Sequence, residues 1–409
     1  MTSPTLMVRP ARRLPRVNRY AAYCRAIEGR RLPLAWCDLE ALRFNLATVA
    51  KRAAGRPVRV ATKSVRSVEL LRWVLAHPGF AGVMAYSAAE AAHLASAGID
   101  DVLIAYPTVE RSDLVKALQA VAEGTTITFM ADDEEQLLVY RTEALKLGVV
   151  ADVCLDIDMS MALPGLHFGV LRSPITSAAT AQRLARSVAA SPNLRLTGVM
   201  GYEAQIAGLP DRSGNPALDA GVRTLKGLSI PRLQQRRAAV VAALEADGHA
   251  LRFVNGGGTG SLESTADDRS VTELTAGSAI YSPTLFDGYR TFRHDPAAGF
   301  ALPIVRRPNA RTLTCHGGGY IASGSAGSER LPSPYLPVGL KLTANEGAGE
   351  VQTPVVASED HALKIGDPVF FRHAKAGELC ERFNALVLIE GHTCVGEALT
   401  YRGEGHAFL

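Results

Sequence analysis

Apolar residues follow two different rhythms along the chain between residues 58 and 275. Short runs of consecutive apolar residues alternate with longer stretches in which leucine, valine or alanine recurs every three or four positions. The first rhythm is typical of buried parallel strands and the second of amphipathic helices. Eight strands are predicted in this way, at residues 58–61, 82–85, 102–105, 126–130, 153–157, 196–200, 251–254 and 271–274.

Helices are predicted between most of these strands. Ser87 and Glu90 form a capping box that opens one of them, and an alanine-rich run marks another at residues 177–190. A further helix is predicted at residues 232–246. Eight strands that alternate with helices indicate an α/β fold, and we expect a (β/α)8 barrel of the TIM type. A doubly wound open sheet is the alternative that the same pattern allows.

The pattern changes after residue 285, where glycine and proline separate short β segments and helical periodicity ends. Six such segments are predicted, at residues 312–315, 339–343, 351–356, 368–372, 386–389 and 397–401. A further apolar strand, at residues 34–37, precedes the barrel strands. We therefore expect an N-terminal arm that packs on the β domain, a barrel unit and a mostly β C-terminal domain, at residues 1–33, 34–286 and 287–409.

Composition excludes several classes of partner. The 409 residues carry a formal net charge of only +4, which gives no basis for electrostatic capture of nucleic acid. No stretch approaches the roughly 20 apolar residues of a membrane span. Arginines crowd the first segment, but it lacks the apolar region of a signal peptide, so a surface arm is expected. The cysteines are scattered without CxxC spacing, which favours reduced thiols in a cytoplasmic enzyme.

Lys63 lies at the predicted carboxyl end of the first barrel strand, where barrel enzymes carry their chemistry. Arg59 and Arg66 flank it in the sequence. Like charges nearby lower the pKa of a lysine and keep its amine nucleophilic, so we expect a reactive amine here. The alternative is an ordinary solvated lysine that follows a strand.

Glycine-rich turns follow the seventh and eighth predicted strands. In the first turn, NGGGTGS, Gly257, Gly258 and Thr259 can surround a phosphate with bare backbone N–H groups and a hydroxyl. Gly277 and Ser278 lie in the second turn. Barrel phosphate sites recur at this place, and a phosphate site together with a strand-end lysine is what pyridoxal 5'-phosphate (PLP) requires. The alternative for the first turn is a flexible loop at the barrel rim.

Four segments carry a resemblance to a known family: VRVATKS around Lys63, the first glycine turn, TELTAGS at residues 272–278 and a late segment at residues 358–380. Together they resemble the fold type III, alanine racemase-like PLP enzymes, and within these the D-threonine aldolase and D-serine dehydratase-like branch (amino acid deaminase/aldolase). The resemblance implies that Lys63 binds the cofactor covalently, that the two glycine turns bind its phosphate, and that the protein is a homodimer. Tyr281, soon after the second turn, either hydrogen-bonds this phosphate or is a core tyrosine.

The resemblance also implies a divalent metal ion in the β domain, held by a histidine and a nearby cysteine or aspartate. His373 and Cys380 are the matching residues, with Glu378 and Glu381 as rival second ligands. The family's two ligands are usually two residues apart, whereas His373 and Cys380 are seven apart. A histidine packed at the end of a strand is the alternative.

Three further positions bear on the mechanism that the resemblance implies. His167 lies where relatives commonly carry an arginine aimed at the pyridine nitrogen, and Tyr202 is expected to contact the cofactor. Gln205 lies where aldolases carry a histidine that takes the proton of the β-hydroxyl, a role that an amide cannot fill. The base is then a metal-bound hydroxide, His361 or another group.

The function that these features predict is a PLP- and divalent-metal-dependent lyase acting on a small β-hydroxy-D-amino acid. Breaking Cα–Cβ gives glycine and an aldehyde, whereas loss of hydroxide gives a keto acid and ammonia. Dehydration tolerates the loss of the histidine better, because Lys63 can remove the Cα proton itself. A PLP-dependent amino acid racemase on the same fold is the first alternative, and a non-catalytic PLP-binding protein is the second.

Overall fold

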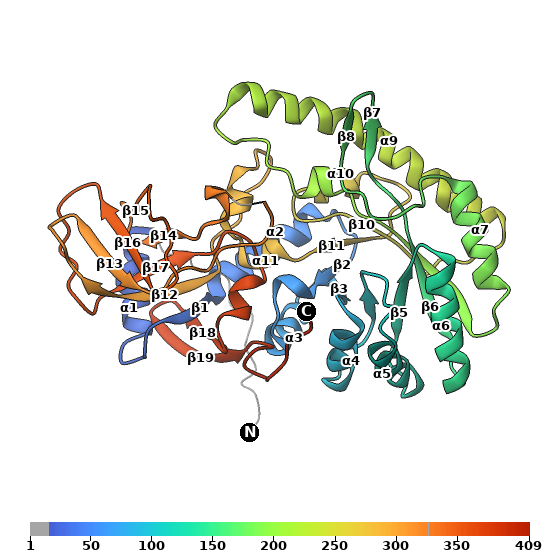
Figure 1. The fold of residues 1–409 in the computed structure, drawn as a ribbon, viewed down its shortest axis with the longest axis horizontal. Helices are drawn as coiled ribbons and strands as arrows, with labels where there is room; N and C mark the ends of the chain where they lie inside the picture. The colour runs from blue at the N-terminus through green and yellow to red at the C-terminus, as the bar shows by residue number, and fades with distance from the viewer. Residues whose placement is uncertain (1–15, 326) are drawn as a thin grey trace.

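A computed structural model describes residues 16–325 and 327–409. Two units lie beside each other: a barrel surrounded by helices, and a β domain built from strands near both ends of the chain (Figure 1). The first fifteen residues of the expected N-terminal arm lie outside the described residues.

Eight parallel strands close into a barrel, which confirms the predicted fold and excludes the open sheet. The eighth strand pairs with the first, with Leu274 opposite Val58 and Ala276 opposite Val60. Each observed strand overlaps a predicted one, because all eight are buried apolar runs. In order around the barrel they are β2 (Val58–Ala61), β3 (Phe80–Ala85), β4 (Val102–Ile104), β5 (Ile127–Ala131), β6 (Ala151–Asp156), β9 (Leu194–Gly201), β10 (Phe253–Gly256) and β11 (Glu273–Ala276).

Helices cover the outside of the barrel, and most begin at a side-chain cap (Figure 1). The Ser87 hydroxyl accepts the N–H of Glu90, as the predicted capping box requires, and Ser177 caps its helix in the same way. The helices are α2 (Leu39–Arg52), α3 (Val68–Leu75), α4 (Ala88–Ser96), α5 (Arg111–Ala122), α6 (Glu134–Leu147), α7 (Ala178–Ala189), α8 (Ala204–Ala207), α9 (Pro216–Ala246), α10 (Leu262–Ala266) and α11 (Ser278–Tyr281).

Helix α9 is longer than its sequence predicts. Its expected start at residue 232 follows Pro231, a residue that favours the first turn of a helix. The helix instead begins at Pro216 under an Asn215 cap and continues through Pro231. Its length matters for the site because it carries Arg237 inward to the barrel.

The β domain is a nine-stranded sheet in which β1 (Leu34–Asp38) lies between β12 (Ala298–Arg306) and β18 (Ala385–Glu390). Residues 34–38 therefore belong to this sheet, whereas the sequence placed them with the barrel. A continuous apolar run is compatible with either partner sheet, and long-range pairing decides between them. The remaining strands are β13 (Thr312–His316), β14 (Ser333–Leu336), β15 (Leu340–Leu342), β16 (Gln352–Ala357), β17 (Pro368–Arg372) and β19 (Thr393–Leu399).

The described part of the N-terminal arm is helix α1 (Arg16–Ala26), which packs on the β domain. The Tyr20 hydroxyl donates to the Pro368 carbonyl over 3.0 Å, and the Tyr23 ring lies 5.5 Å from the Phe370 ring between centroids. Within the described residues, no helix combines the length and hydropathy that crossing a membrane requires.

Candidate active site

A cavity of about 320 Å³ lies at the carboxyl ends of the barrel strands, the usual place for a barrel active site. Seven of the residues predicted from the sequence line it: Lys63, Tyr202, Gly257, Gly258, Thr259, Gly277 and Ser278. Strands β2, β9, β10 and β11 end here, so segments that are far apart in the sequence meet in one place.

Lys63 extends into the cavity from a single turn that follows strand β2. The Thr62 hydroxyl donates to the Met84 carbonyl over 2.9 Å, which ties this turn to β3. The Lys63 amine donates to the Tyr106 hydroxyl over 3.0 Å. Burial by itself raises the pKa of Tyr106, but the charge and hydrogen bond of Lys63, with the charge of Arg172, lower it below its ordinary value.

The two arginines beside Lys63 in the sequence are each paired with carboxylates. Arg59 lies inside the barrel, with its Nε 2.7 Å from Glu273 and an Nη 3.1 Å from Asp101. Arg66 pairs with Glu381. Each arginine therefore has carboxylate partners that compensate its charge.

Both glycine turns line the cavity and pack so closely on neighbouring protein atoms that neither has room for a side chain. A Cβ on Gly258 would lie 2.7 Å from the Ala207 Cβ. A Cβ on Gly277 would lie 2.7 Å from the Ala61 carbonyl oxygen. The Thr259 hydroxyl accepts the Ala279 N–H over 3.0 Å and so links the two turns. The N–H groups of Gly257 and Gly258 are already bonded to Glu203 and to the Ser261 hydroxyl, so a phosphate here would be bound by the other N–H groups and hydroxyls of the two turns.

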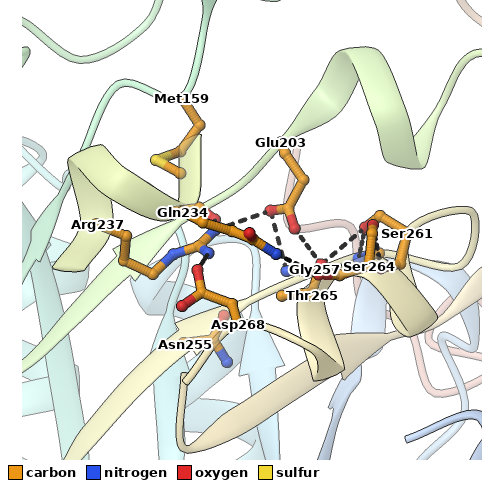
Figure 2. Close-up of polar contacts among 12 residues, drawn as sticks. Met159, Glu203, Gln234, Arg237, Asn255, Gly257, Ser261, Ser264, Thr265 and Asp268 are labelled. Carbon is orange, nitrogen blue, oxygen red and sulfur yellow. Dashed lines mark hydrogen bonds and ion pairs between the residues drawn. The ribbon is translucent and has the colours of Figure 1, made fainter. Parts of the chain in front are cut away.

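A buried ionic cluster fixes the first glycine turn from outside the cavity, as Figure 2 shows. Arg237 of helix α9 pairs with Asp268, and its other Nη lies 3.3 Å from Glu203 and 2.9 Å from the Gly201 carbonyl oxygen. The same Glu203 carboxylate accepts the N–H of Gly257 over 3.1 Å. The end of strand β9, helix α9 and the first glycine turn are thus joined through the Arg237 guanidinium group and its partner Glu203.

The structure does not bring His167 to the cavity. It lies exposed on β8 (Leu166–Phe168), in a hairpin with β7 (Met161–Leu163) that periodicity did not predict. Arg172, five residues later, lines the cavity, with its guanidinium carbon 5.9 Å from the ring centroids of both Tyr106 and Tyr202. Arg172 and Tyr106 were not predicted from the sequence because both lie on irregular loops. On such loops the spacing of residues does not determine which way a side chain points.

Asp156 also lines the cavity, at the end of strand β6. Burial and the nearby charge of Asp132 raise the pKa of Asp156 to about 8, against the opposing charge of Arg172. A carboxyl group with such a pKa carries a proton at neutral pH and can donate a hydrogen bond to a ligand.

Tyr281 and Gln205 both lie away from the cavity lining. The Tyr281 hydroxyl donates to the Val65 carbonyl over 3.0 Å, so it occupies the core position that the sequence left open. The Gln205 amide donates to the Met159 carbonyl over 2.6 Å and to the Ser229 hydroxyl over 3.1 Å. His361 lies in a separate surface hollow of the β domain.

The predicted metal ligands do not converge on one point. Cys380 donates to the Val65 carbonyl over 3.3 Å, and burial raises the pKa of its thiol to about 12. Glu378 accepts the N–H of Ser323, and Glu381 pairs with Arg66. No group of three or more His, Cys, Asp or Glu residues within 16–325 and 327–409 is placed to hold a metal ion.

His373 is buried, and burial, with the charge of Arg372, lowers the pKa of its imidazole to about 3. Among the described residues neither ring nitrogen makes a hydrogen bond of normal geometry. The Ala298 backbone lies close enough to oppose the lowering of the His373 pKa. One neutral imidazole is available, but the second ligand is absent, so the donor set does not fit a divalent metal.

The β domain contributes two cations to the cavity, Arg330 and Lys375. With Lys63 and Arg172, they make the cavity strongly cationic, and Asp156 and Asp158 are the acidic residues that line it. This charge pattern suits an anionic ligand.

A closed parallel barrel, a following β domain and a lysine that faces two glycine turns define the alanine racemase type of architecture. The chain belongs to the alanine racemase N-terminal domain family, whose sequence model matches residues 37–284.

Similar proteins agree with this assignment. Over 252 residues the chain is 28% identical to a 3-hydroxy-D-aspartate aldolase from Paracoccus denitrificans (strain Pd 1222), covering 61% of this chain and 60% of that protein. It therefore spans less than two thirds of the length of this curated relative.

Solved structures show the same fold at low sequence identity. D-threonine aldolase from Filomicrobium marinum superposes with a TM-score of 0.78 at 21% identity, over 92% of this chain and 96% of that one. D-threo-3-hydroxyaspartate dehydratase from Delftia sp. HT23 superposes with a TM-score of 0.72 at 19% identity, over 92% of this chain and 98% of that one. These likenesses confirm the predicted fold over nearly the whole chain, including the β domain.

Replacing Arg237 with methionine is expected to lower the free energy of unfolding by about 3–5 kcal/mol, because it leaves two buried carboxylates without their partner. The measurement is urea denaturation of the cofactor-free protein, followed by circular dichroism. Arg183→Met, at an exposed position on helix α7, is the matched control and should unfold like the wild type. Equal midpoints for Arg237→Met and the control would contradict the role of the cluster.

Asp156 is expected to make the stability of the cofactor-free protein depend on pH. Its folded pKa of about 8 lies above its ordinary value of 3.8, so between these values the folded state retains a proton that the unfolded state releases. Stability therefore falls as pH rises through this window, and Asp156→Asn should reduce the fall. Urea midpoints compared at about pH 5 and about pH 8 test this; parallel losses in both proteins would contradict it.

Proposed function

We propose that the protein is a PLP-dependent lyase that acts on a β-hydroxy-D-amino acid. One observation carries the proposal: Lys63 lines the same cavity as the two glycine turns that follow strands β10 and β11. A cofactor with an aldehyde at one end and a phosphate at the other needs this pair of features.

Each residue of the cavity has a role in this proposal. Lys63 would hold the cofactor covalently, and the turns at Gly258 and Gly277 would hold its phosphate. Bound PLP withdraws electrons from the bonds at the substrate Cα. Arg172 and Tyr202 line the space left for the ring and for the substrate. The Lys63 amine, once released by the incoming substrate, can accept the Cα proton.

The substrate class is inferred from the charge of the cavity and from the relatives. Arg172, Arg330 and Lys375 offer more positive charge than a single α-carboxylate requires. The curated relative is named for 3-hydroxy-D-aspartate, and the similar structures are named for D-threonine and D-threo-3-hydroxyaspartate. A β-hydroxy-D-amino acid, with a second carboxylate as the favoured side chain, accounts for both observations.

Aldol cleavage and dehydration both remain within the proposal. Dehydration fits the chain better, because the buried amide of Gln205 cannot take a proton from the β-hydroxyl. A racemase or a non-catalytic PLP-binding protein is not favoured by the names of the relatives. A divalent metal is left out of the proposal, because the predicted ligands do not form a donor set around His373.

We further propose that the protein works as a homodimer on a small-molecule substrate in the cytoplasm. The family resemblance supports the dimer. All six cysteines are free thiols, which supports a reducing compartment.

The cofactor assignment predicts that the purified protein, reconstituted with PLP, has a visible absorption band that borohydride removes. Lys63→Ala should lack this band, because it removes the amine that would form the covalent bond, and the Lys375 amine is held by Ser323. Mass spectrometry of the reduced protein should place the added mass on the peptide that contains Lys63. A band of wild-type intensity in Lys63→Ala, or modification of a different lysine, would refute the assignment.

The substrate proposal predicts consumption of D-configured β-hydroxy acids and not of their L enantiomers. Holoenzyme is incubated with 3-hydroxy-D-aspartate, D-threonine, D-serine and the phenylserine isomers, and aldehyde and keto acid are assayed together. Keto acid as the main product supports dehydration, and aldehyde with glycine supports aldol cleavage. Inversion at Cα without either product would establish the racemase alternative, and the absence of any spectral change would establish the non-catalytic one.

A further inference from the structure

A segment of the β domain packs directly on the turn that carries Lys63. Gly377 has a φ of +97°, and a Cβ on it would lie 1.9 Å from the Lys63 carbonyl oxygen. Cys380 donates to the Val65 carbonyl, and Glu381 pairs with Arg66. This side of the segment is therefore fixed relative to Lys63 by close packing, a hydrogen bond and an ion pair.

The preceding residues of the same segment are fixed to the barrel end. The carbonyl oxygens of His373 and Ala374 accept the N–H groups of Thr284 and Leu285, each over 3.1 Å. Leu285 itself lines the cavity. Lys375 thus lies between two anchored stretches, and the direction of its side chain is constrained by the backbone on both sides.

Lys375 projects to the cavity that Lys63 enters. Its amine donates to the Ser323 hydroxyl over 3.2 Å, and Glu378 binds the backbone N–H of that serine. Burial, with the charges of Arg330 and Lys63, lowers the pKa of Lys375, and the charge of Glu378 opposes this shift. The Lys375 amine is therefore held at the cavity by the Ser323 hydroxyl, near the Glu378 carboxylate, whose charge favours the ammonium form.

Lys375 also occupies a specific place relative to His373. The two residues are two positions apart, the spacing that the family resemblance implies for metal ligands, and they line the same small hollow. An ammonium group cannot ligate a metal ion, since it has donors and no lone pair. It does carry positive charge, which is what a metal ion would supply at this point.

We propose that the Lys375 ammonium is the built-in cation of this site, binding the β-oxygen of the substrate and stabilising the negative charge that develops there in place of a divalent metal. The inference rests on the proposed lyase function and adds a catalytic residue to it. A fixed cation at a developing oxyanion lowers the barrier without reorganisation, and removal of one such group typically slows turnover by about 100- to 1000-fold.

The experiment compares holoenzymes of the wild type, Lys375→Met, Lys375→Arg and Lys375→Asp, with Lys341→Met on the exposed face of the β domain as control. The wild type should contain no stoichiometric metal by mass spectrometry and should keep its activity in EDTA. Lys375→Met should lose about 100-fold or more in kcat on the β-hydroxy substrate, and Lys375→Arg should retain more of it. Lys341→Met should behave as the wild type.

Two readouts separate catalysis from structure and do not depend on turnover. Lys375→Met should keep the borohydride-sensitive cofactor band and the spectral response to D-alanine, which has no β-hydroxyl. Lys375→Asp places a carboxylate two residues from His373 and should bind Mn²⁺ at about one ion per chain in calorimetry, where the wild type shows none.

The outcomes distinguish this inference from the function on which it rests. A wild type without activity on any β-hydroxy acid would overturn the lyase proposal. A wild type that is active but loses its activity in EDTA, or a fully active Lys375→Met, would overturn the role of Lys375 alone. If Lys375→Asp does not bind Mn²⁺, residue 375 does not lie where a second metal ligand beside His373 would lie, and this part of the inference is wrong.

Discussion

The geometry of the site depends on one buried ionic interaction, that of Arg237 with Glu203 and Asp268. A charge this deeply buried is stable only with its partners in place, so helix α9, the end of strand β9 and the loop before β11 must assemble together. Glu203 also accepts the N–H of Gly257, so the position of the first glycine turn depends on the same ion pairs. The glycine turn is therefore held in one shape by the protein itself, which would reduce the ordering cost of binding a ligand there.

The β domain forms part of the candidate active site. Its sheet contains β1 from the start of the chain, and Arg372 makes two hydrogen bonds, of 2.6 and 2.9 Å, to Asp287 at the junction with the barrel. Packing of Gly377 against the Lys63 turn then brings Lys375 to the cavity. In the proposed function, the barrel would supply the anchors for the cofactor, and the β domain would supply part of the charge that a substrate meets. This division explains how one barrel architecture can serve different reactions.

Much of the fold and part of the site could be predicted from the sequence. The barrel strands were predictable because each is a buried apolar run, and Lys63 and the glycine turns because they follow those strands directly. Tyr106, Arg172 and Lys375 were not, because they reach the cavity from loops whose course is set by tertiary contacts. The surroundings of His373 and Cys380 depend on tertiary contacts in the same way: the Cys380 thiol donates to the Val65 carbonyl, and the His373 ring lies 6.4 Å from the Tyr281 ring between centroids. Strand β12 was not predicted from the sequence, because nearby glycine and proline residues obscured its β pattern. It nevertheless lies at the centre of its sheet.

We propose that Lys63 and the two glycine turns together bind one PLP molecule. A crystal structure of the protein grown with PLP would show both points of attachment at once. We expect continuous electron density from the Lys63 side chain to the cofactor, with the phosphate seated between the turn at Gly257–Thr259 and the turn at Gly277 and Ser278. Cofactor bound elsewhere, or a phosphate directed away from both turns, would contradict the account.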